Sequence, residues 1–394
     1  MSSDVILVLN AGSSSIKFSL FRATANPGHA DLLCDGQMSG IGHTIHFRAA
    51  DEKNAVLVDQ SLQESTDHEA ALQELLAWCA RQFSAYRLIC AGHRVVHGGM
   101  RYTAPVLIDK EVVAELQKLV PLAPLHQPHH LAAIAALSKL YPDLPQVACF
   151  DTSFHHTQPA VASEYALPRA LSDEGVRRYG FHGLSYEYIA GRLPQVLAAD
   201  ASRVVVAHLG SGASMCAMQD GKSVATTMGF TALDGLPMSR RCGNLDPGVV
   251  LYLLQEKQMS ADAVSNLLYQ ESGLFGVSGI SDDMQTLLAS DDPHAEQAIA
   301  LFVYRINREL GSLVAALGGI DALVFTAGIG EHASEIRRRV CESAGWLGLQ
   351  LDIDANQKHA SCISQHDSRV SVWVIPTDED LMIARHAAQL MQIR

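Results

Sequence analysis

Three glycine-rich segments carry basic side chains that could neutralise a phosphoryl group. They are Gly92–Gly99 with Arg94, Arg178–Gly183 with His182, and Met238–Asn244 with Arg241. Glycine lets the backbone approach a ligand closely, and guanidinium groups bind phosphate oxygens through paired hydrogen bonds. Taken one at a time, these residues are better explained as a surface ion pair (Arg94), a satisfied turn histidine (His182) and a solvated loop charge (Arg241). They become informative beside a site that binds phosphate.

A turn near the N-terminus has the composition of a phosphate site. Residues 5–21 read V-I-L-V-L-N-A-G-S-S-S-I-K-F-S-L-F, which predicts a buried strand, a tight turn from Asn10 to Ser15, and a second strand. Backbone N–H groups and hydroxyls in such a turn can donate to an anion, and Lys17 adds a positive charge. It is not a Walker loop, because the G-x-x-x-x-G-K-[ST] pattern is absent and a strand follows. A serine-rich surface hairpin is the alternative.

The same pattern occurs again halfway along the chain. The apolar strand 203–207 leads into His208-Leu209-Gly210-Ser211-Gly212-Ala213-Ser214. Aligning the two turns places His208 on Asn10 and Gly210 on Gly12, an offset of 198 residues in a chain of 394. The repeat suggests an internal duplication, with two similar lobes that each offer a phosphate-binding turn to a nucleotide cleft. Beside these turns, the three basic segments favour phosphoryl transfer, in which arginines stabilise the transferred group.

Composition narrows the class of protein. A chain of 394 residues with 48% apolar residues predicts two folded domains, and a formal charge of −13 disfavours nucleic-acid binding. No basic leader or long apolar segment is present, so we expect a cytoplasmic protein without a membrane partner. Eight scattered cysteines predict reduced, mostly buried thiols. The 18 histidines show no zinc-ligand spacing.

Hydrophobic periodicity predicts alternating strands and helices, and therefore an α/β fold. Helices are expected over residues 68–83, 109–119, 131–140, 186–193, 247–256, 261–269, 294–317 and 381–390. Strands are expected over residues 88–91, 146–150, 203–207, 322–325 and 371–375. Ala327–Glu331 is predicted to be a Gly-x-Gly turn, with a helix beginning near Ala333.

Nine motifs, in order along nearly the whole chain, resemble the acetate kinase family. They are N-A-G-S-S-S-I-K (10–17), G-H-R-V-V-H-G-G (92–99), A-P-L-H (123–126), F-D-T-S-F-H (150–155), Y-G-F-H-G (179–183), M-G-F-T-x-L (228–233), R-C-G-N-L-D-P (241–247), F-T-A-G-I-G-E (325–331) and P-T-D-E-D-L (376–381). The resemblance implies two duplicated ribonuclease-H-like lobes, each a mixed β-sheet flanked by helices, around a nucleotide cleft. It places residues 1–151 and 381–394 in an N-terminal lobe and residues 152–380 in a C-terminal lobe that forms a homodimer.

The resemblance also implies roles for individual residues. Arg94 would bind the acyl carboxylate, Arg241 the transferring phosphoryl group, and His182 the transition state, with Asp151 as the active-site aspartate. The metal positions would be Asn10 and Glu379, holding Mg²⁺ or Mn²⁺. Nucleotide-binding positions for ATP and ADP would be Lys17, His208, Leu209, Gly210, Ser211, Gly212, Asp283, Met284, Gln285, Gly328, Ile329, Gly330, Glu331 and His332. Positions lining the acyl pocket would be Val96, Leu125 and Phe181.

The implied reaction is reversible, direct in-line transfer of the ATP γ-phosphoryl group to acetate, giving acetyl phosphate and ADP. A short carboxylate has a pKa of roughly 4 and is already ionised at pH 7, so it needs no general base. We therefore expect Asp151 to orient an arginine, or to bind the metal through water, rather than to remove a proton.

Several residues depart from the family pattern, and alternatives stay open. Ser211 replaces the usual Asn, Gln285 an Arg, His332 an Asn and Ala232 a Pro, and residues 244–247 read N-L-D-P in place of D-I-D-P. Three of these changes fall at nucleotide-binding or pocket positions, so they bear on the preferred nucleotide and acyl chain rather than on the type of reaction. Propionate or butyrate kinase is the closest alternative, although the bulk of Val96 favours acetate. A chaperone-like or actin-like ATPase of the same superfamily, or a scaffold with an inactive site, would lack acyl kinase activity.

Overall fold

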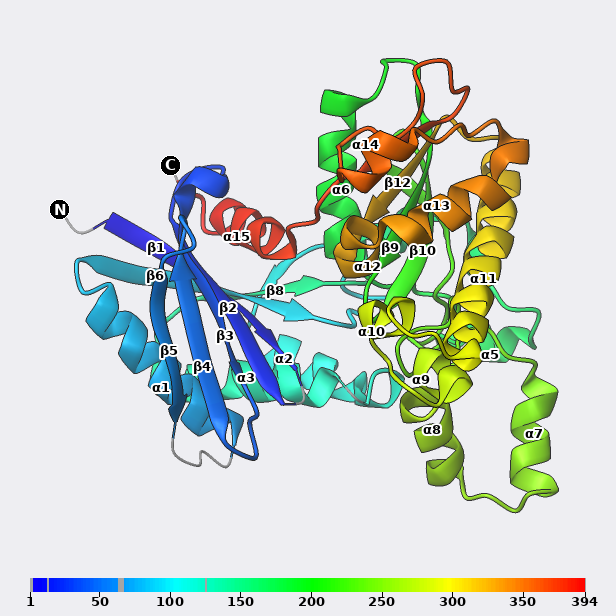
Figure 1. Ribbon diagram of the computed structural model, residues 1–394. Helices are drawn as coiled ribbons and strands as arrows, with labels where there is room; N and C mark the ends of the chain where they lie inside the picture. Colours follow the sequence, from blue (N-terminus) through cyan, green and yellow to red (C-terminus); the bar gives the residue numbers. More distant parts are fainter. Residues whose placement is uncertain (1–2, 13, 63–66, 125, 394) are drawn as a thin grey trace. The chain divides into compact units, whose positions relative to one another are not determined.

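Two β-sheets organise the chain, one in each of two units (Figure 1). The computed structural model describes residues 3–12, 14–62, 67–124 and 126–393. The N-terminal unit comprises Met1–Phe154 and Asp378–Arg394, and the C-terminal unit comprises His155–Thr377. The chain therefore passes between the units twice, once within the 3₁₀ helix η3 (Ser153–Thr157) and once just before the C-terminal helix.

The N-terminal unit contains an eight-stranded mixed sheet in the order β5-β4-β3-β2-β1-β6-β8-β7. Its strands are β1 (Ser3–Ala11), β2 (Ser15–Arg22), β3 (Leu32–Ser39), β4 (Ile45–Asp51), β5 (Val56–Leu62), β6 (Tyr86–Val95), β7 (Val106–Leu107) and β8 (Gln146–Phe150). β1 pairs antiparallel with β2 and parallel with β6, so the predicted first turn joins two hydrogen-bonded strands.

Helices cover both faces of this sheet. They are α1 (His68–Gln82), α2 (Lys110–Lys118), α3 (Gln127–Leu140) and α15 (Glu379–Leu390), with short 3₁₀ turns η1 (His29–Asp31) and η2 (Val120–Leu122). Val5, Leu7 and Leu9 of β1 share a core with α1 and α3. α15 packs on the other face, where a side chain at Gly92 would come within 2.4 Å of Ile383. Gly92 is therefore required for α15 to lie close to β6.

The C-terminal unit repeats the topology in a five-stranded sheet of order β11-β10-β9-β12-β13. Its strands are β9 (Arg203–Leu209), β10 (Ala213–Gln219), β11 (Lys222–Thr226), β12 (Ala322–Thr326) and β13 (Ser371–Val374). This order, with β9 antiparallel to β10 and parallel to β12, matches β3-β2-β1-β6-β8. The repeated order supports the predicted duplication, and the predicted α/β fold with two mixed sheets is confirmed.

Helices also flank the second sheet, with α6 and α11 on opposite sides of it (Figure 1). The helices of this unit are α4 (Ala160–Ser163), α5 (Arg169–Asp173), α6 (Gly183–Val196), α7 (Pro247–Gln255), α8 (Ala261–Gln270), α9 (Gly273–Ser278), α10 (Met284–Leu288), α11 (Pro293–Leu317), α12 (Ala327–His332), α13 (Ser334–Ser343), η4 (Gly345–Leu347) and α14 (Ile353–Gln357). Asp292 caps the N-terminus of α11, and Gly318 ends the helix with a φ of 67°.

Two local predictions were wrong. Ala327–Glu331 forms the short helix α12 rather than a turn, because Ala327 itself makes the sharp change of direction at a φ of 64°. The Glu331 carboxylate holds this bend by accepting from the backbone N–H of Ala327 at 2.7 Å and of Thr377 at 3.2 Å. The strand predicted to end before Gly92 continues as β6 to Val95, so Arg94 lies on a strand and not in a loop.

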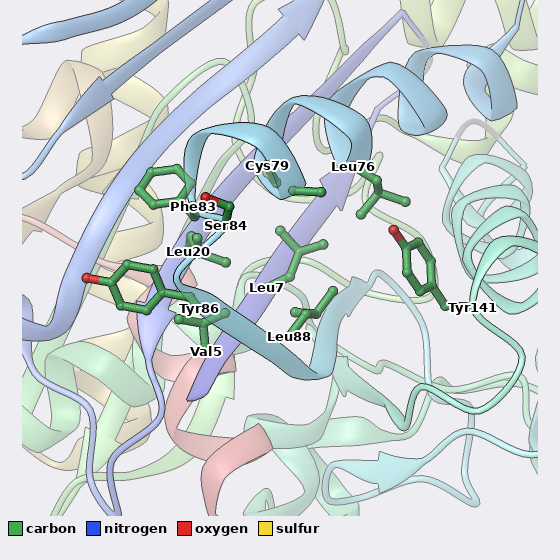
Figure 2. Close-up of a pocket in the computed structure, with 11 residues that line it drawn as sticks. Val5, Leu7, Leu20, Leu76, Cys79, Phe83, Ser84, Tyr86, Leu88 and Tyr141 are labelled. Carbon is green, nitrogen blue, oxygen red and sulfur yellow. The ribbon is translucent and has the colours of Figure 1, made fainter. Parts of the chain in front are cut away.

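An apolar cavity of about 310 Å³ lies in the N-terminal unit between the sheet and the end of α1 (Figure 2). Leu7, Leu76 and Leu88 are among its lining residues, and the described residues around it include none of the predicted site residues. All eight cysteines are free thiols, of which Cys362 is exposed. In the part of the chain that the structure describes, every helix is too short or too polar to cross a bilayer.

Candidate functional site

Arg94 is the central cation of the N-terminal unit's polar cluster. It extends from β6 to Asp151, directly after β8. Its Nε lies 3.1 Å from both Asp151 oxygens, and its Nη2 lies 2.7 Å from Oδ2. The Asp151 side chain is 1% exposed and that of Arg94 is 22% exposed. Asp151 therefore fixes the guanidinium from its buried side.

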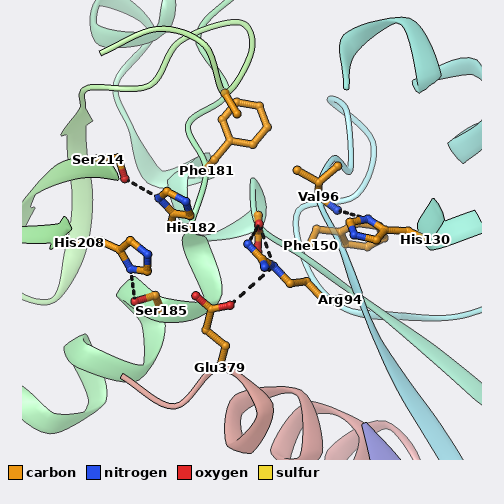
Figure 3. Close-up of polar contacts among 12 residues, drawn as sticks. Arg94, Val96, His130, Phe150, Phe181, His182, Ser185, His208, Ser214 and Glu379 are labelled. Carbon is orange, nitrogen blue, oxygen red and sulfur yellow. Dashed lines mark hydrogen bonds and ion pairs between the residues drawn. The ribbon is translucent and has the colours of Figure 1, made fainter. Parts of the chain in front are cut away.

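Glu379 approaches Arg94 from the first turn of α15. Its carboxylate oxygen lies 3.6 Å from Nε of Arg94 (Figure 3). Burial opposes the Arg94 charge, but Asp151 and Glu379 outweigh it, so the pKa of Arg94 lies above its ordinary value. Among the described residues, only Asp151 and Glu379 pair with this guanidinium, through Nε and Nη2. Its Nη1 group can therefore donate to an added anion.

The first glycine- and serine-rich turn lies between β1 and β2. Asn10 and Lys17 are cross-strand partners close to the turn of this hairpin, and Lys17 is exposed. The N–H of Gly12 donates to the Ser15 carbonyl at 2.7 Å, and His68 Nε2 donates to the Gly12 carbonyl at 2.7 Å. Ser13 lies outside the described residues. Hydrogen bonds thus hold the backbone at Gly12 and Ser15, on either side of the predicted phosphate turn.

Carboxylates gather at the start of α15, where the metal was predicted. Asp378 caps the helix by accepting from the Leu381 N–H at 2.9 Å. Ser19 donates to Asp380 at 2.5 Å. Burial and the neighbouring carboxylates of Asp378 and Glu379 raise the pKa of Asp380 to about 6. Within the described residues, no cluster of three or more His, Cys, Asp or Glu side chains forms a ready metal cage.

The predicted acyl-pocket residues divide between the units. Val96 is 5% exposed in the N-terminal unit, and Phe181 is 1% exposed in the C-terminal unit. Leu125 lies outside the described residues. The Val96 N–H donates to Nδ1 of His130 at 3.1 Å (Figure 3). Burial, followed by the charge of Arg94, lowers the pKa of His130 well below its usual value, so its ring is neutral and accepts this bond.

His182 is held in an unusual backbone conformation at the start of α6. It has a φ of 59°, and Gly180 two residues earlier has a φ of 74°. A side chain at Gly180 would come within 2.5 Å of the His155 ring. His155 Nε2 donates to the Phe181 carbonyl at 2.9 Å. The chain before His182 is thus fixed by glycine on one side and by a buried histidine on the other.

The His182 and His208 rings stack, with centroids 4.1 Å apart and planes 17° apart. Each ring meets a serine hydroxyl through Nδ1, at 2.8 Å in both cases (Figure 3). Ser214 is the partner of His182, and Ser185 is the partner of His208. The predicted transition-state histidine and the histidine of the second phosphate turn therefore form one rigid pair.

Arg241 lies beside the same turn. A side chain at Gly212 would lie 3.2 Å from Nε2 of His182 and 3.9 Å from Nη1 of Arg241. Arg241 Nη1 donates to the Ala232 carbonyl at 2.9 Å. The departure from the family pattern at Ala232 therefore leaves this contact intact, because the contact uses the backbone. Within the C-terminal unit, the structure brings the turn, His182 and Arg241 close together.

A cavity of about 480 Å³ in the C-terminal unit collects most of the predicted nucleotide-binding residues. Its lining includes Gly210, Ser211, Asp283, Met284, Gln285, Gly328, Ile329 and His332. The volume is within the range of small-molecule and cofactor pockets. Glycines in the lining, Gly210 and Gly328, let the backbone approach a phosphate closely. The three departures at Ser211, Gln285 and His332 all lie in this cavity.

Some predicted nucleotide residues have structural contacts of their own. The Asp283 carboxylate caps α10 by accepting from the N–H and the hydroxyl of Thr286, both at 2.8 Å. These hydrogen bonds lower the pKa of Asp283. Glu331 holds the bend at Ala327, and Leu209 is fully buried. Of these three residues, only Asp283 is among the residues that line the cavity.

Comparison with known proteins identifies the family. The acetokinase family model matches residues 5–385. A protein named acetate kinase from Rhodopseudomonas palustris is 63% identical over 392 residues, covering 98% of both chains. The chain belongs to the acetokinase family. The predicted resemblance is thereby confirmed.

Solved structures of acetokinase relatives match over nearly their full length. A propionate kinase from Francisella tularensis aligns with a TM-score of 0.91 at 35% identity, covering 97% of this chain and 98% of its own. Acetate kinase from Porphyromonas gingivalis aligns with a TM-score of 0.88 at 34% identity, covering 99% and 100%. These matches confirm the fold. They include kinases of two different acids, so the preferred acyl substrate of this chain has to be argued from its own residues.

Sequence reasoning missed the residues that hold the two histidines. Ser214 closes the repeated turn, and Tyr186 lies four residues after His182, one helical turn away on the same face of α6. Both are completely buried. The helical spacing from His182 to Tyr186 was visible in the sequence, but their meeting at Ser214 depends on how α6 packs on the sheet.

Proposed function

We propose that this acetokinase is an acetate kinase, which transfers the γ-phosphoryl group of ATP to acetate and forms acetyl phosphate and ADP. The observation that carries this proposal is the arrangement of Arg94. Asp151 holds two of its nitrogens, and Nη1 is left to bind an acyl carboxylate. A buried, bidentate aspartate in this position makes the guanidinium a fixed receptor for an anion.

Acetate needs no activation by a base, because it is ionised at neutral pH. In the proposed reaction, the task of the N-terminal unit would be to bind and orient the acyl carboxylate. Asp151 performs this task indirectly by fixing Arg94, which agrees with the expectation that it removes no proton. Much of the rate then comes from alignment of the two reactants.

The C-terminal unit would hold the nucleotide and stabilise the transferring group. The cavity beside Gly210 and Gly328 would take ATP, and Arg241 and His182, both close to Gly212, would donate to the equatorial oxygens of the phosphoryl group. Charge spreads over these oxygens in the transition state, so donors fixed in advance lower the barrier.

A divalent cation, Mg²⁺ or Mn²⁺, would be held by the Asn10 amide oxygen and the Glu379 carboxylate. Hard oxygen ligands suit Mg²⁺, which usually keeps several waters and needs few protein ligands. The carboxylates at the start of α15 add negative charge near Glu379. When bound, the cation would neutralise charge on the β- and γ-phosphates.

Propionate kinase activity is the second candidate, because a solved propionate kinase shares 35% identity and a TM-score of 0.91 with this chain. One methylene in an apolar pocket changes binding by about 1–3 kcal/mol, so propionate can be a slower substrate of the same enzyme. The β-branched side chain of Val96, which is 5% exposed, favours acetate.

We also propose a homodimer formed through the C-terminal unit. Helix α7 buries none of its nine residues, although its sequence is P-G-V-V-L-Y-L-L-Q. Val249, Leu251 and Tyr252 are 40%, 53% and 49% exposed. An apolar helix face of this kind is typical of a protein interface, and closed homodimers are the commonest oligomers.

The proposed reaction is tested by trapping its product. The purified protein is incubated with ATP, Mg²⁺ and acetate, and hydroxylamine converts any acyl phosphate to a hydroxamate. We expect ADP and acetyl hydroxamate in equal amounts. ADP release without hydroxamate from any short carboxylate would instead indicate an ATPase and contradict the proposal.

A further inference from the structure

A chain of two buried hydroxyls ends on His182. The Tyr186 hydroxyl lies 2.5 Å from Ser214 Oγ, and Ser214 Oγ lies 2.8 Å from Nδ1 of His182. Ser214 and Tyr186 are both 0% exposed, and His182 is 9% exposed. Burial of these polar atoms is costly unless they are hydrogen-bonded, so the direction of donation along this chain sets which imidazole nitrogen carries the proton.

The two ends of the chain indicate that direction. Burial, followed by the nearby Cys216, raises the pKa of Tyr186 well above its ordinary value, so its hydroxyl stays protonated and can donate to Ser214. At the other end, Nε2 of His182 faces Gly212, and a side chain at Gly212 would lie 3.2 Å from it. A phosphoryl oxygen only accepts hydrogen bonds, so a neutral His182 serves it only when the proton is on Nε2.

The same unit contains another histidine–serine pair, His155 and Ser223, in which geometry fixes the position of the proton. His155 Nε2 faces the Phe181 carbonyl at 2.9 Å, and a carbonyl cannot donate. Burial lowers the pKa of His155 to about 4, so its ring is neutral and its Nδ1 accepts, with Ser223 Oγ at 2.9 Å. A buried serine can therefore donate to a histidine Nδ1 in this sheet.

We infer that Tyr186 and Ser214 are positioning residues that donate along the chain Tyr186 to Ser214 to His182, and thereby hold His182 with its proton on Nε2. This inference rests on the proposed function, because it assigns the proton that His182 would offer to the transferring phosphoryl group. The stack of His182 on His208 restricts rotation of the ring, so the hydroxyl chain selects the proton position and the stack selects the ring orientation.

The proton position is measured directly by nitrogen NMR of protein carrying ¹⁵N-labelled histidine, with the His182 signals assigned by their loss in His182→Gln. We expect a protonated Nε2 and an unprotonated, hydrogen-bonded Nδ1 in the wild type. In Ser214→Ala we expect Nδ1 to lose the signature of an accepted hydrogen bond. A proton on Nδ1 in the wild-type enzyme would overturn the inference.

Kinetics distinguish positioning from a general loss of packing. We expect Ser214→Ala to lower kcat about tenfold, from loss of one hydrogen bond that orients a transition-state donor, with the KM values for acetate and ATP nearly unchanged. Tyr186→Phe keeps the ring and should lower kcat less. The matched control is Ser163→Ala, which removes another buried hydroxyl of the C-terminal unit, one that contacts Ala160 and Arg177, and should keep kcat within about twofold. Equal losses in both serine variants would overturn the inference.

The two readouts separate this inference from the proposed function. Formation of acyl phosphate by a wild type whose His182 carries its proton on Nδ1 would contradict the inference and leave the proposed function intact. A wild type that gives the expected spectrum but forms no acyl phosphate would contradict the proposed function and support the hydrogen-bond assignment.

Discussion

Arg94 depends on Asp151 as much as Asp151 depends on Arg94. The Asp151 carboxylate is 1% exposed and accepts a hydrogen bond from Nη2 of Arg94 at 2.7 Å. Removing one member of a buried ion pair takes compensation away from the other charge, and such a change costs about 3–5 kcal/mol. The pair therefore contributes both to the stability of the unit and to the geometry of the proposed carboxylate site.

Arg94→Ala should lower kcat/KM for acetate by about 100-fold or more, because it removes a fixed donor to the reacting carboxylate and phosphoryl group. Initial rates of acyl phosphate formation measure the effect, and thermal melting shows whether the variant is folded. Arg101→Ala is the control, since Arg101 is 55% exposed and forms its ion pairs with Glu111 and Glu115 of α2; it should stay within about twofold of the wild type. Wild-type turnover in a folded Arg94→Ala enzyme would refute the assigned role.

Val96→Ala should shift the acyl preference toward longer acids. The change removes two methyl groups from a side chain that is 5% exposed, and the backbone N–H that donates to His130 is retained. We expect the ratio of kcat/KM for propionate to that for acetate to rise roughly tenfold, the effect of about 1.4 kcal/mol. An unchanged ratio would show that Val96 does not line the acyl pocket.

Sequence patterns identified these residues, but not their partners. The glycine-rich contexts of Arg94 and His182 and the family motifs predicted both positions. The bond from Val96 to His130, the Ser214 hydroxyl and the contact of Ser19 with Asp380 join residues 34, 32 and 361 positions apart. Such contacts depend on how elements pack, which local periodicity does not specify.

Strand β6 links the core to the site, because it carries buried His93 next to Arg94. His93 Nε2 lies 2.8 Å from Gln146 Oε1 on β8, and Gln146 in turn donates to Ser138 on α3. Burial lowers the pKa of His93 to about 4, against a weaker opposing effect of Gln146. His93 is therefore neutral in the folded protein and stabilises the strand only while it stays neutral.

Acid should weaken the fold through His93. Because its pKa is depressed in the folded state, its contribution is complete above the unfolded pKa of about 6.5 and is lost as the pH falls through about 4. The difference between wild type and His93→Gln in free energy of unfolding should therefore decrease by about 3 kcal/mol from pH 7 to pH 4. Urea melts at several pH values measure it, and a pH-independent difference would contradict this account.

The sequence predicted which helices and strands exist better than it predicted where they begin and end. Periodicity located β8, α8 and the long helix α11 within a residue or two. It ended β6 too early because Gly92 looked like a turn, whereas this glycine is needed for close packing of α15. It missed α12 because a Gly-x-Gly sequence is typical of a turn. The bend before α12 is stabilised by the Glu331 carboxylate, which accepts from the backbone N–H groups of Ala327 and Thr377.

The duplicated topology explains why both units present a turn of similar sequence after their first strand. In each sheet the turn joins the central strand to its antiparallel neighbour, and the other neighbour is parallel. The offset of the motifs predicted this repeat. The three additional strands at the edges of the N-terminal sheet, and the helices α7 to α10 inserted in the C-terminal unit, could not be predicted from the repeat.

The apolar face of α7 predicts the oligomeric state. The wild type should sediment at about twice 42.5 kDa, and Leu251→Glu should shift it toward the monomer because a charge would be buried at the interface. Leu107→Glu changes an equally exposed leucine, 48% against 53%, in the N-terminal unit and should leave the dimer intact. A monomeric wild type, or a dimer unaffected by Leu251→Glu, would refute the proposed interface.

The most direct test of the proposed function compares acetate, propionate and butyrate as substrates of the wild-type enzyme with ATP and Mg²⁺. Trapped hydroxamate is measured in each case to obtain kcat/KM for acyl phosphate formation. We predict acyl phosphate from acetate with the highest kcat/KM, a lower value for propionate and the lowest for butyrate. A higher kcat/KM for propionate or butyrate, or hydrolysis of ATP without acyl phosphate from any of the three acids, would contradict it.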